Sequence, residues 1–563
     1  MAEPPIHTTT IPVLIIGGGI VGLSASLFLS SHSIPHFLIE RHPTTSQHPR
    51  ARGLNTRAME IFRSIGIDGA VREAGGSLSP SKGIVKGTSF IEVMERMTRK
   101  EGDGQRGAMP LAGWLNGIVS PTEGARCTQD MMEPVLVKAA RERGGELRYN
   151  TQCESVEQDE QGVTVTMRDR EPPHLVSTVR ARYLIAADGA SSPIRKALGI
   201  ATTGKGALGN LINILFCADL SELVRGREIS ICTIVQPSLR GMLTAINNSD
   251  VWVFHLCYDP DKEKAEAYTT ERVEELLRLA IGIQDLEIEI KSMMPWKPSD
   301  VVAQSMQSGR IFLAGDAAHQ TTPYAGQGAT TGIADVFDLS WKLASVLSGQ
   351  AGPRLLDSYE SERLPVGRFV AKKSGELADG YGLPDMKRGK LTWAWNMARR
   401  LPMITGFGYQ YTDSPAVIND EEAPGWKSWW NMPWSIQSLV LGINGKPGTR
   451  VPHVWVQDSA GERVSTLDLC GKRFLLLTGS QGKPWCQAAS DVAEKMGVGL
   501  EAYRVGPTGD VSDPKKRWEY AAGIGAYGAL LVRPDGFVAW RVKDQEGGLG
   551  ERLEGVLEKI LCR

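Results

Sequence analysis

The chain has 563 residues, of which 42% are hydrophobic and 23% are charged, and its formal net charge is −1. This length exceeds what one hydrophobic core supports, so we expect roughly two to four domains. The near-neutral charge gives no electrostatic reason to expect binding to nucleic acid or to an anionic membrane.

The cysteines and the N-terminal end narrow the class of protein further. The eight cysteines are scattered without a Cys-x-x-Cys pair, and no histidines cluster at metal-ligand spacing. We therefore expect no disulfide framework and no bound metal, in a protein of a reducing compartment such as the cytoplasm. Residues 1–5 lack the basic region of a signal peptide. Residues 11–29 have the hydropathy of a membrane span, but their glycine spacing favours a strand, a turn and a helix, so we expect no membrane span.

A glycine-rich motif follows the first predicted strand. Residues 11–16 form a short β-branched run, typical of a buried parallel strand, and Gly17, Gly19 and Gly22 follow at the G-x-G-x-x-G spacing. The first glycine permits a tight turn, the second lets the backbone approach a pyrophosphate, and the third lets the next helix pack on the strand. The amides at the start of that helix, predicted over 20–31, would face phosphates.

An acidic residue ends the second predicted strand. Residues 36–39 are hydrophobic and lead into Glu40, about 20 residues after the glycine motif. An acid at this place accepts hydrogen bonds from ribose hydroxyls and would repel a 2′-phosphate. Together the motif and the acid predict a dinucleotide-binding unit of the Rossmann type, without separating FAD from NAD. A purely structural glycine-rich turn is the alternative.

The second informative segment lies in the middle of the chain. Residues 183–187 form a hydrophobic strand that ends in Asp188 and Gly189, and a predicted helix follows with Arg195 in its first turn.

The third segment has the same form. Residues 309–315 form a strand that delivers Asp316, whose carboxylate can accept a hydrogen bond from a ribityl hydroxyl. Pro323, Gly326 and Gly328 would let the backbone pass close to a flat ring. The helix predicted to begin near Gly326 would direct free amides at the negative charge of a reduced flavin. The three segments in this order predict a flavin held by a discontinuous domain.

These segments closely resemble the flavoprotein aromatic hydroxylases, the group of p-hydroxybenzoate hydroxylase and phenol hydroxylase. Within the group, the chain is most similar to 2,4-dichlorophenol monooxygenase and to hydroxylases of aromatic polyketide pathways. Residues 48–60 resemble the stretch where family arginines meet the FAD phosphates. Residues 126–133 resemble the segment whose Gln lies beside the flavin and whose Glu starts a helix. Residues 340–343 and 358–363 match helices that close the FAD domain.

The resemblance implies FAD as the bound cofactor and a set of residues that hold it. The expected FAD contacts are Gly17, Gly19, Gly22, Glu40, Arg41, Arg50, Gln129, Asp188, Asp316, Pro323, Gly326, Gln327, Gly328 and Thr330. Thr330 departs from the family, since many members have an Asn there that hydrogen-bonds the flavin, and the Thr hydroxyl has a shorter reach.

The candidate catalytic residues are Pro323, Arg52 and His255. We expect the backbone from Pro323 onward to hold the reacting edge of the flavin. Arg52 stands where phenol hydroxylase has an Asp thought to help deprotonate the substrate, so no carboxylate base carries over; Arg52 would stabilise a phenolate or bind a phosphate. His255 and His319 are the candidate bases, and a buried structural histidine is the alternative for both.

The resemblance implies a monooxygenase that uses NADH or NADPH and dioxygen to hydroxylate a phenolic or aromatic polyketide-type substrate in secondary metabolism. The reaction would pass through a flavin C4a-hydroperoxide, which the protein must shield from water. No second G-x-G-x-x-G provides a lasting nicotinamide domain, so the nicotinamide would bind transiently.

Three other functions remain open on the sequence alone. The same oxygen chemistry would serve a Baeyer–Villiger or epoxidising monooxygenase. A flavin reductase or dehydrogenase would use the same cofactor without activating oxygen. A binding protein for flavin or quinone would keep the scaffold without catalysis.

The expected fold is α/β, with a Rossmann-type FAD-binding domain like that of p-hydroxybenzoate hydroxylase, an inserted mixed-sheet substrate domain and a C-terminal thioredoxin-like domain. Within the substrate domain, Asn213, Gln236, Trp252 and His255 are candidate lining residues. The expected boundaries are 1–80, 120–200 and 299–385 for the FAD domain, 81–119 and 201–298 for the substrate domain, 386–445 for a Trp-rich connector and 446–563 for the C-terminal domain.

The C-terminal domain is expected to lack thioredoxin chemistry. Its Cys486 has no second cysteine two positions before it. The domain would then have a structural role or provide the surface of a homodimer.

Overall fold

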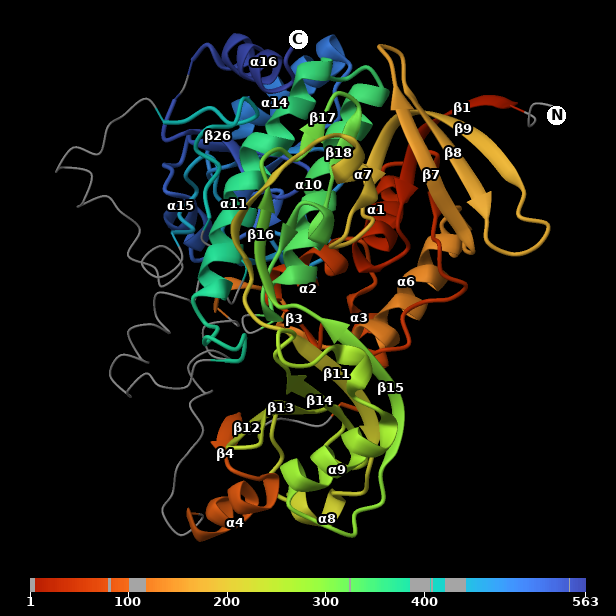
Figure 1. Ribbon diagram of the computed structural model, residues 1–563. Coiled ribbons are helices and arrows are strands. Elements are labelled where there is room, and N and C mark those ends of the chain that lie inside the picture. Colours follow the sequence, from red (N-terminus) through yellow and green to blue (C-terminus); the bar gives the residue numbers. More distant parts are fainter. Residues whose placement is uncertain are drawn as a thin grey trace.

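The computed structural model describes residues 6–78, 83–100, 118–323, 326–384, 406, 409–420, 442–545 and 547–563, without the side chains of residues 6–9 and 99–100. Figure 1 shows two long helices, α10 (Gly328–Leu347) and α11 (Asp357–Gly375), at the centre of the molecule. A first sheet lies beside them, a second sheet lies at one end of the molecule, and the C-terminal part, coloured blue, packs against α10 and α11.

The first sheet has eight strands, and β1 is paired in parallel with both β2 and β9. The strand order is β17-β18-β9-β1-β2-β6, and β8 joins β7 to β9. The strands are β1 (Ile6–Ile16), β2 (His36–Ile39), β6 (Glu146–Arg148), β7 (Thr151–Gln158), β8 (Val163–Asp169), β9 (Val176–Ala186), β17 (Gln307–Ser308) and β18 (Ile311–Leu313).

Helices and short strands surround this sheet. Helix α1 packs against both α6 and α10. The helices are α1 (Ile20–Ser31), α2 (Thr56–Ser64), α3 (Asp68–Ala74), α6 (Gln129–Glu142), α7 (Pro193–Ala197) and the 3-10 turns η2 (Gly315–Ala317) and η4 (Pro353–Leu356). The short strands are β3 (Gly53–Leu54) paired with β5 (Ala125–Arg126), and the set β10 (Thr202–Ala207), β16 (Ser299–Ala303) and β19 (His319–Gln320).

The second sheet has six strands in the order β15-β11-β14-β13-β12-β4, antiparallel except for the β4–β12 pair. Its strands are β4 (Ile84–Gly87), β11 (Leu211–Cys217), β12 (Ile231–Gln236), β13 (Leu239–Ala245), β14 (Val251–Cys257) and β15 (Glu289–Trp296). The helices with it are α4 (Phe90–Lys100), α8 (Ser221–Val224), η1 (Ala265–Ala267) and α9 (Thr270–Ile281).

The two faces of the second sheet differ. Alternate residues such as Ile214, Trp252 and Phe254 pack with α4, α8 and α9 in a separate hydrophobic core. The indole of Trp252 is fully buried there, and its Nε1 donates to Ala218 O at 3.1 Å. The prediction that Trp252 lines a substrate site is therefore wrong, because strand alternation turns it toward the core.

The C-terminal part is an α/β unit with the strand order β21-β20-β24-β23-β22-β25-β26. One face of its sheet shares a continuous core with the first sheet and its helices, including an edge-to-face contact of Trp341 and Phe474 at 5.8 Å. Its elements are β20 (Trp455–Gln457), β21 (Arg463–Ser465), β22 (Phe474–Thr478), α14 (Lys483–Met496), β23 (Leu500–Gly506), β24 (Val511–Ser512), α15 (Arg517–Ala522), β25 (Ala529–Val532), β26 (Val538–Val542) and α16 (Leu549–Ile560).

Several predicted elements can be compared with the structure. The helix predicted over 20–31 has those bounds. Helix α10, predicted to begin near Gly326, begins at Gly328, because Gly326 has a φ of +62° in the turn before it. The tryptophans of the predicted connector (393, 395, 426, 429, 430 and 434) lie outside the described residues.

In the described part of the chain, no helix is both long and apolar enough to cross a bilayer.

Candidate functional site

The three predicted flavin segments meet at one edge of the first sheet. Strands β1, β9 and β18 are adjacent and parallel, and their last residues, Ile16, Ala186 and Leu313, lie in register. Parallel strands bring their carboxyl ends to the same edge, where ligands of open α/β sheets bind. The turns that follow the three strands therefore lie side by side, although about 300 residues separate the first from the last.

The three glycines of the motif differ in whether the surrounding protein leaves room for a side chain. A Cβ on Gly17, whose φ is +111°, would lie 2.2 Å from Ala187 O, and one on Gly22 would lie 1.9 Å from Gly17 O. A Cβ on Gly19 would have its nearest protein atom at 3.7 Å. The protein thus excludes side chains at the first and third glycines but leaves room at the second. This cradle fits the pyrophosphate of a dinucleotide.

Glu40 and Arg41 follow β2 beside this loop. The Glu40 carboxylate accepts from Gly18 N at 2.6 Å and from His42 N at 2.9 Å. These bonds fix the acid next to the glycine motif. Oε1 also lies 2.6 Å from His42 Nδ1, whereas Oε2 keeps further capacity to accept from a ribose hydroxyl. Arg41 is exposed, and its carbonyl accepts from Arg170 Nη1 at 3.0 Å.

Gln129 and Glu133 approach the same loop from α6. Gln129 Nε2 donates to Glu133 Oε1 at 2.6 Å, and Ser46 N donates to Glu133 Oε2 at 2.7 Å. Burial raises the pKa of Glu133, and these hydrogen bonds oppose that shift. The segment was expected to start its helix at the Glu. The helix starts at Gln129 instead, because the preceding residue, Thr128, is extended.

The second predicted flavin segment, which ends in Arg195, is hydrogen-bonded to the third, which contains Asp316. Arg195 Nη1 donates to Ala317 O at 2.7 Å. The Asp188 carboxylate accepts from Ser192 Oγ at 2.7 Å and from Ile194 N at 3.1 Å, so it caps the start of α7. Asp188 would therefore contact FAD, if bound, in addition to capping α7.

Asp316 is the accessible residue of an otherwise buried turn. Its neighbours Gly315, Ala317 and Ala318 are buried, whereas Asp316 is exposed. The surrounding protein raises the pKa of Asp316 by desolvation, and the charges of His319 and Arg50 oppose that shift. A carboxylate held this way is available to a ligand with hydroxyl groups.

Pro323 and Gly326 lie in the exposed turn before α10. Gly326 N donates to Pro323 O at 3.0 Å, while residues 324 and 325 lie outside the described residues. The first amides of α10, starting at Gly328, have no carbonyl one turn earlier in the helix. Their positive end suits a group that carries negative charge.

Gln327 and Thr330 are buried at the start of α10 and hydrogen-bonded to protein. Asn55 Nδ2 donates to Gln327 Oε1 at 3.0 Å, and the Thr330 hydroxyl donates to Gln327 O at 3.0 Å. The single proton of that hydroxyl is therefore used within the helix. Thr330 therefore has no further proton to donate to the flavin, which is the contact that the Asn at this position makes in many family members.

A row of side chains crosses the inner face of the second sheet. The strand registers align Thr233 with Met242, Met242 with His255, His255 with Asn213, and Asn213 with Met294. These residues alternate with those of the separate core, so they occupy the opposite face of the sheet. We call this set, Thr233, Met242, His255, Asn213 and Met294, the transverse row.

The polar centre of the transverse row is uncharged. His255 Nδ1 is hydrogen-bonded to Asn213 Oδ1, and its Nε2 is 3.2 Å from Thr244 Oγ1. Desolvation and the nearby His48 lower the pKa of His255 to about 3. His255 is therefore neutral near pH 7 and a weak base, which disfavours its predicted catalytic role.

The structure also shows where His319, a candidate base, and Gln236, a candidate lining residue, are located. His319 is buried, and its Nε2 lies 2.7 Å from Asp335 Oδ2 beneath the Asp316 turn, as the structural alternative foresaw. Gln236 Nε2 donates to Thr88 O at 3.1 Å and Leu279 O at 3.3 Å, so Gln236 joins the second sheet to its own helices. The prediction that Gln236 lines the substrate site is wrong, because its position alternates with that of Thr233.

Two arginines reach the second sheet from the first domain. Arg52 Nη1 donates to Ser230 O at 3.1 Å, just before β12, and Arg50 Nη2 lies 3.7 Å from Met294 Sδ in β15. The charge of Arg50 also opposes the rise in the pKa of Asp316, so one side chain is close to both sides of the candidate site. Desolvation and the charge of Arg126 lower the pKa of Arg52 to about 10, which leaves it protonated at neutral pH.

Several buried polar atoms in this region have no hydrogen-bond partner among the described residues. They include Arg52 Nη2, Thr233 Oγ1, Trp296 Nε1 and both ring nitrogens of His48. Desolvation and Arg50 lower the pKa of His48 to about 4, although Asp130 opposes the shift. Buried polar atoms normally have partners, so this group fits a site for a polar ligand. No motif in the sequence sets His48, Thr233 and Trp296 apart, and only their unsatisfied hydrogen-bonding capacity in the structure reveals them.

A cavity of about 300 Å³ lies behind the start of α10. Its described walls come from the start of α10, α11, Gly406 and residues 409–413, with Asn55 and Arg57, and none of them comes from the second sheet. We do not assign the substrate to this cavity, because the transverse row contributes nothing to it.

Comparison with known proteins agrees with this geometry. Residues 10–374 match the FAD binding domain family, and residues 444–563 match the family described as aromatic-ring hydroxylase, C-terminal. The chain is 39% identical to tetracenomycin A2 monooxygenase-dioxygenase of Streptomyces glaucescens, over 99% of this chain and 98% of the relative. It is 32% identical to 2,4-dichlorophenol 6-monooxygenase of Delftia acidovorans, over 98% of each chain.

A solved structure has a similar architecture over the whole chain. It is a ternary complex of aklavinone-11 hydroxylase with FAD and aklavinone, with a TM-score of 0.81, 32% identity and 100% coverage of both chains.

Proposed function

The chain belongs to the family of FAD-dependent aromatic-ring hydroxylases, and from this membership we propose that it is a monooxygenase that uses NADH or NADPH and dioxygen to hydroxylate a phenolic or aromatic polyketide-type substrate. One observation carries the proposal: the accessible Asp316 carboxylate follows β18 at the edge where three parallel strands end, and Arg50, whose charge acts on Asp316, contacts Met294 of the transverse row. A cofactor side and a substrate side therefore meet at one place.

The cofactor side has a residue for each part of FAD. Gly19 leaves room for the pyrophosphate, Glu40 would accept from the adenosine ribose, and Asp316 would accept from the ribityl chain. The amides at the start of α10, from Gly328, would stabilise negative charge on the pyrimidine end of the ring. Arg41, Arg50, Gln129, Asp188, Pro323, Gly326, Gln327 and Thr330 complete the proposed surroundings. Bound FAD would supply the redox chemistry that activates dioxygen.

The substrate side would bind and orient the aromatic ring. Thr233 and Trp296 each offer a buried hydrogen-bond donor to an oxygen of the substrate. Arg52, which remains protonated at neutral pH, would stabilise a phenolate, and a phenolate is a better nucleophile than the phenol. The backbone at Pro323 would hold the reacting edge of the cofactor, and the sheet above it would exclude water.

We propose that the chain has a discontinuous FAD domain (1–80, 120–200 and 299–385), a substrate domain (81–119 and 201–298) and a connector (386–445).

We propose that the last domain, at 446–563, is thioredoxin-like. The order β26-β25-β22-β23 supports this, with β22 and β23 parallel, α14 between them in sequence, and α16 after β26. Cys486 lies at the start of α14, where burial raises the pKa of its thiol, which suits a structural residue.

The function is tested by measuring NADPH and NADH oxidation by the FAD-loaded protein. Phenols and polycyclic quinols are added with and without dioxygen, and products are identified by mass spectrometry and NMR. We expect substrate-stimulated oxidation that requires dioxygen and yields a ring hydroxyl. Oxidation without dioxygen and a reduced organic product would identify a reductase, and oxygen inserted beside a ketone would identify a Baeyer–Villiger enzyme.

A further inference from the structure

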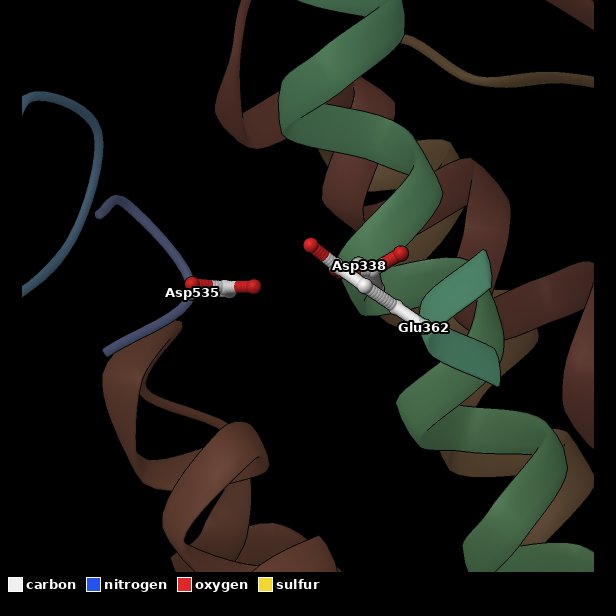
Figure 2. A group of neighbouring side chains, drawn as sticks. All are labelled: Asp338, Glu362 and Asp535. Carbon is white, nitrogen blue, oxygen red and sulfur yellow. The ribbon is translucent and has the colours of Figure 1, made fainter. Parts of the chain in front are cut away.

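A buried charge network joins the C-terminal domain to α10 and α11. Arg533, in the turn between β25 and β26, is fully buried. Its Nη2 donates to Asp338 Oδ1 at 3.0 Å and to Glu362 Oε2 at 2.8 Å, and its Nε donates to Asp535 Oδ1 at 3.1 Å. Lys342 Nζ donates to both Asp338 and Glu362 at 2.7 Å. Figure 2 shows Asp338 and Glu362 on the two helices opposite the loop that carries Asp535.

The acidic group of this network is already neutralised by protein. Asp338, Glu362 and Asp535 are close enough together to suggest a cation site. However, Lys342 and Arg533 bind the first two, and Arg533 also binds Asp535. Burial raises the pKa of Asp338, the neighbouring Glu362 adds to this rise, and the charges of Lys342 and Arg533 oppose it. The group is therefore better explained as a structural ion network than as a metal site.

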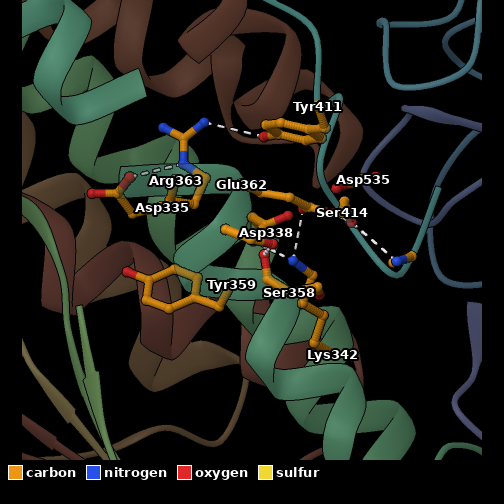
Figure 3. A network of polar contacts seen from close by, with 12 residues as sticks. Asp335, Asp338, Lys342, Ser358, Tyr359, Glu362, Arg363, Tyr411, Ser414 and Asp535 are labelled. Atoms are coloured by element: carbon orange, nitrogen blue, oxygen red, sulfur yellow. Dashed lines mark hydrogen bonds and ion pairs between the residues drawn. The ribbon is translucent and has the colours of Figure 1, made fainter. Parts of the chain in front are cut away.

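The network continues along the same two helices to the Asp316 turn. Arg363, next to Glu362, donates through Nε to Asp335 Oδ1 at 2.9 Å and through Nη2 to Thr331 O at 3.3 Å. Asp335 Oδ2 in turn accepts from Gly315 N at 3.1 Å. Figure 3 shows Arg363 between Asp335 and Tyr411. The buried carboxylate of Asp335 thus fixes the backbone residue that precedes Asp316.

A second connection leads from the same C-terminal turn to the start of α10. Arg57 Nη2 donates to Asp535 O at 2.7 Å, and Arg57 lies in the first turn of α2. The N-cap of that helix, Asn55, donates to Gln327 Oε1 at 3.0 Å. The turn between β25 and β26 is therefore joined both to the Asp316 turn and to the start of α10.

Buried ion networks of this kind contribute more to geometry than to net stability. The cost of removing charges from water offsets most of their attraction, but loss of one partner leaves a buried charge unpaired. The planar fork of Arg533 contacts three carboxylates at fixed directions, which a lysine cannot reproduce. α10, α11 and the C-terminal turn therefore cannot shift independently.

We propose that Asp335 and Arg533 are positioning residues for FAD, and that the C-terminal domain, through Arg533, keeps the Gly315–Asp316 turn in the conformation that binds the cofactor. The inference rests on the proposed contact of Asp316 with FAD. It gives the C-terminal domain a role in cofactor binding that requires no thiol chemistry.

The test compares FAD affinity of the full chain in a double-mutant cycle. Arg533→Lys and Asp335→Asn are each combined with Asp316→Ala, and FAD is titrated into apoprotein by flavin fluorescence. We expect each single variant to weaken FAD binding roughly tenfold, with a changed visible spectrum and reduction potential of the bound flavin. In the Asp316→Ala background, Arg533→Lys and Asp335→Asn should have little further effect, because they act through Asp316.

Arg473→Lys is the matched control, since Arg473 forms an exposed ion pair with Glu501 on the same domain. It should leave FAD affinity unchanged. Equal losses of affinity with and without Asp316 would overturn the inference, as would unchanged affinity, spectrum and potential in folded Arg533→Lys and Asp335→Asn. If Arg533→Lys fails to fold, the Asp335→Asn cycle decides. If Asp316→Ala itself binds FAD normally, the proposed site fails before the inference is reached.

Discussion

The cofactor side and the substrate side of the candidate site are built from different interactions. On the cofactor side, Gly17 and Gly315 have φ angles of +111° and +60°, and buried Asp335 holds the second turn. On the substrate side, the transverse row combines methionines with uncharged polar groups, and the pKa of His255 is about 3. In the proposed function, backbone conformation and buried charge would fix the cofactor position, while shape and neutral hydrogen bonds would select the substrate. Substitutions on the two sides should therefore have separable effects.

The largest effect is expected within the glycine motif, and it differs between two of its members. Gly22→Ala should destabilise the protein by about 3 kcal/mol or more, because its Cβ would lie 1.9 Å from Gly17 O. Gly19→Ala should fold normally and weaken FAD binding roughly 10- to 100-fold, since its Cβ meets no protein atom within 3.7 Å but fills the pyrophosphate approach. Thermal unfolding with and without FAD measures both. A stable, FAD-binding Gly22→Ala variant would refute the packing argument.

Asp316 should show the next largest effect. Asp316→Asn retains the size of the side chain but loses the charge, so FAD affinity should fall roughly 10- to 100-fold, as for a lost charged hydrogen bond. Asp300→Asn is a suitable control, because desolvation also raises the pKa of Asp300, but Asp300 is buried in β16. Fluorescence titration of apoprotein gives the affinities. Full retention of FAD by Asp316→Asn would contradict the ribityl contact.

A change in the transverse row should affect the substrate and not FAD. Thr233→Val removes a buried hydroxyl that has no partner within the described part of the chain, at nearly constant volume. We expect the KM for the aromatic substrate to rise roughly three- to tenfold, the equivalent of about 0.5–1.5 kcal/mol. Met242→Leu, a volume-conserving change in the same row, should have a smaller effect. Loss of FAD from Thr233→Val would show that the two sides are not separable.

The smallest effect is expected for His255→Gln, in the dependence of kcat/KM on pH. Because the pKa of His255 is lowered to about 3, its imidazole is neutral throughout the range from about pH 6 to about pH 9. His255→Gln should therefore change the level of kcat/KM without removing an ionisation from its profile in that range. Disappearance of a step near neutral pH in the variant would identify His255 as the catalytic base after all.

Much of the cofactor side could be predicted from the sequence because its elements have local signatures. Glycine spacing, the strand before Gly17 and the acid at Glu40 are adjacent in sequence, and the helix over 20–31 follows from them. The substrate side depends on strand register between distant segments, which no local pattern supplies. Trp252 and Gln236 were assigned to the wrong face for this reason.

The charge network could be foreseen only in part. Asp335, Asp338 and Lys342 stand at buried positions of a helix that has no other charged residue, a signal that they must have buried partners. The sequence cannot show that one of those partners, Arg533, comes from the C-terminal domain almost 200 residues later. Such contacts arise from domain packing, so they require a structure.

Isotope labelling tests the central claim, oxygen transfer to an aromatic ring, most directly. The FAD-loaded protein is supplied with NADPH, an accepted phenol or quinol and ¹⁸O₂, and the product is examined by mass spectrometry. We predict that the new ring hydroxyl contains oxygen from ¹⁸O₂ and none from ¹⁸O-labelled water in the reciprocal experiment. A product whose added oxygen comes from water, or NADPH oxidation that leaves the ring unlabelled, would contradict the account.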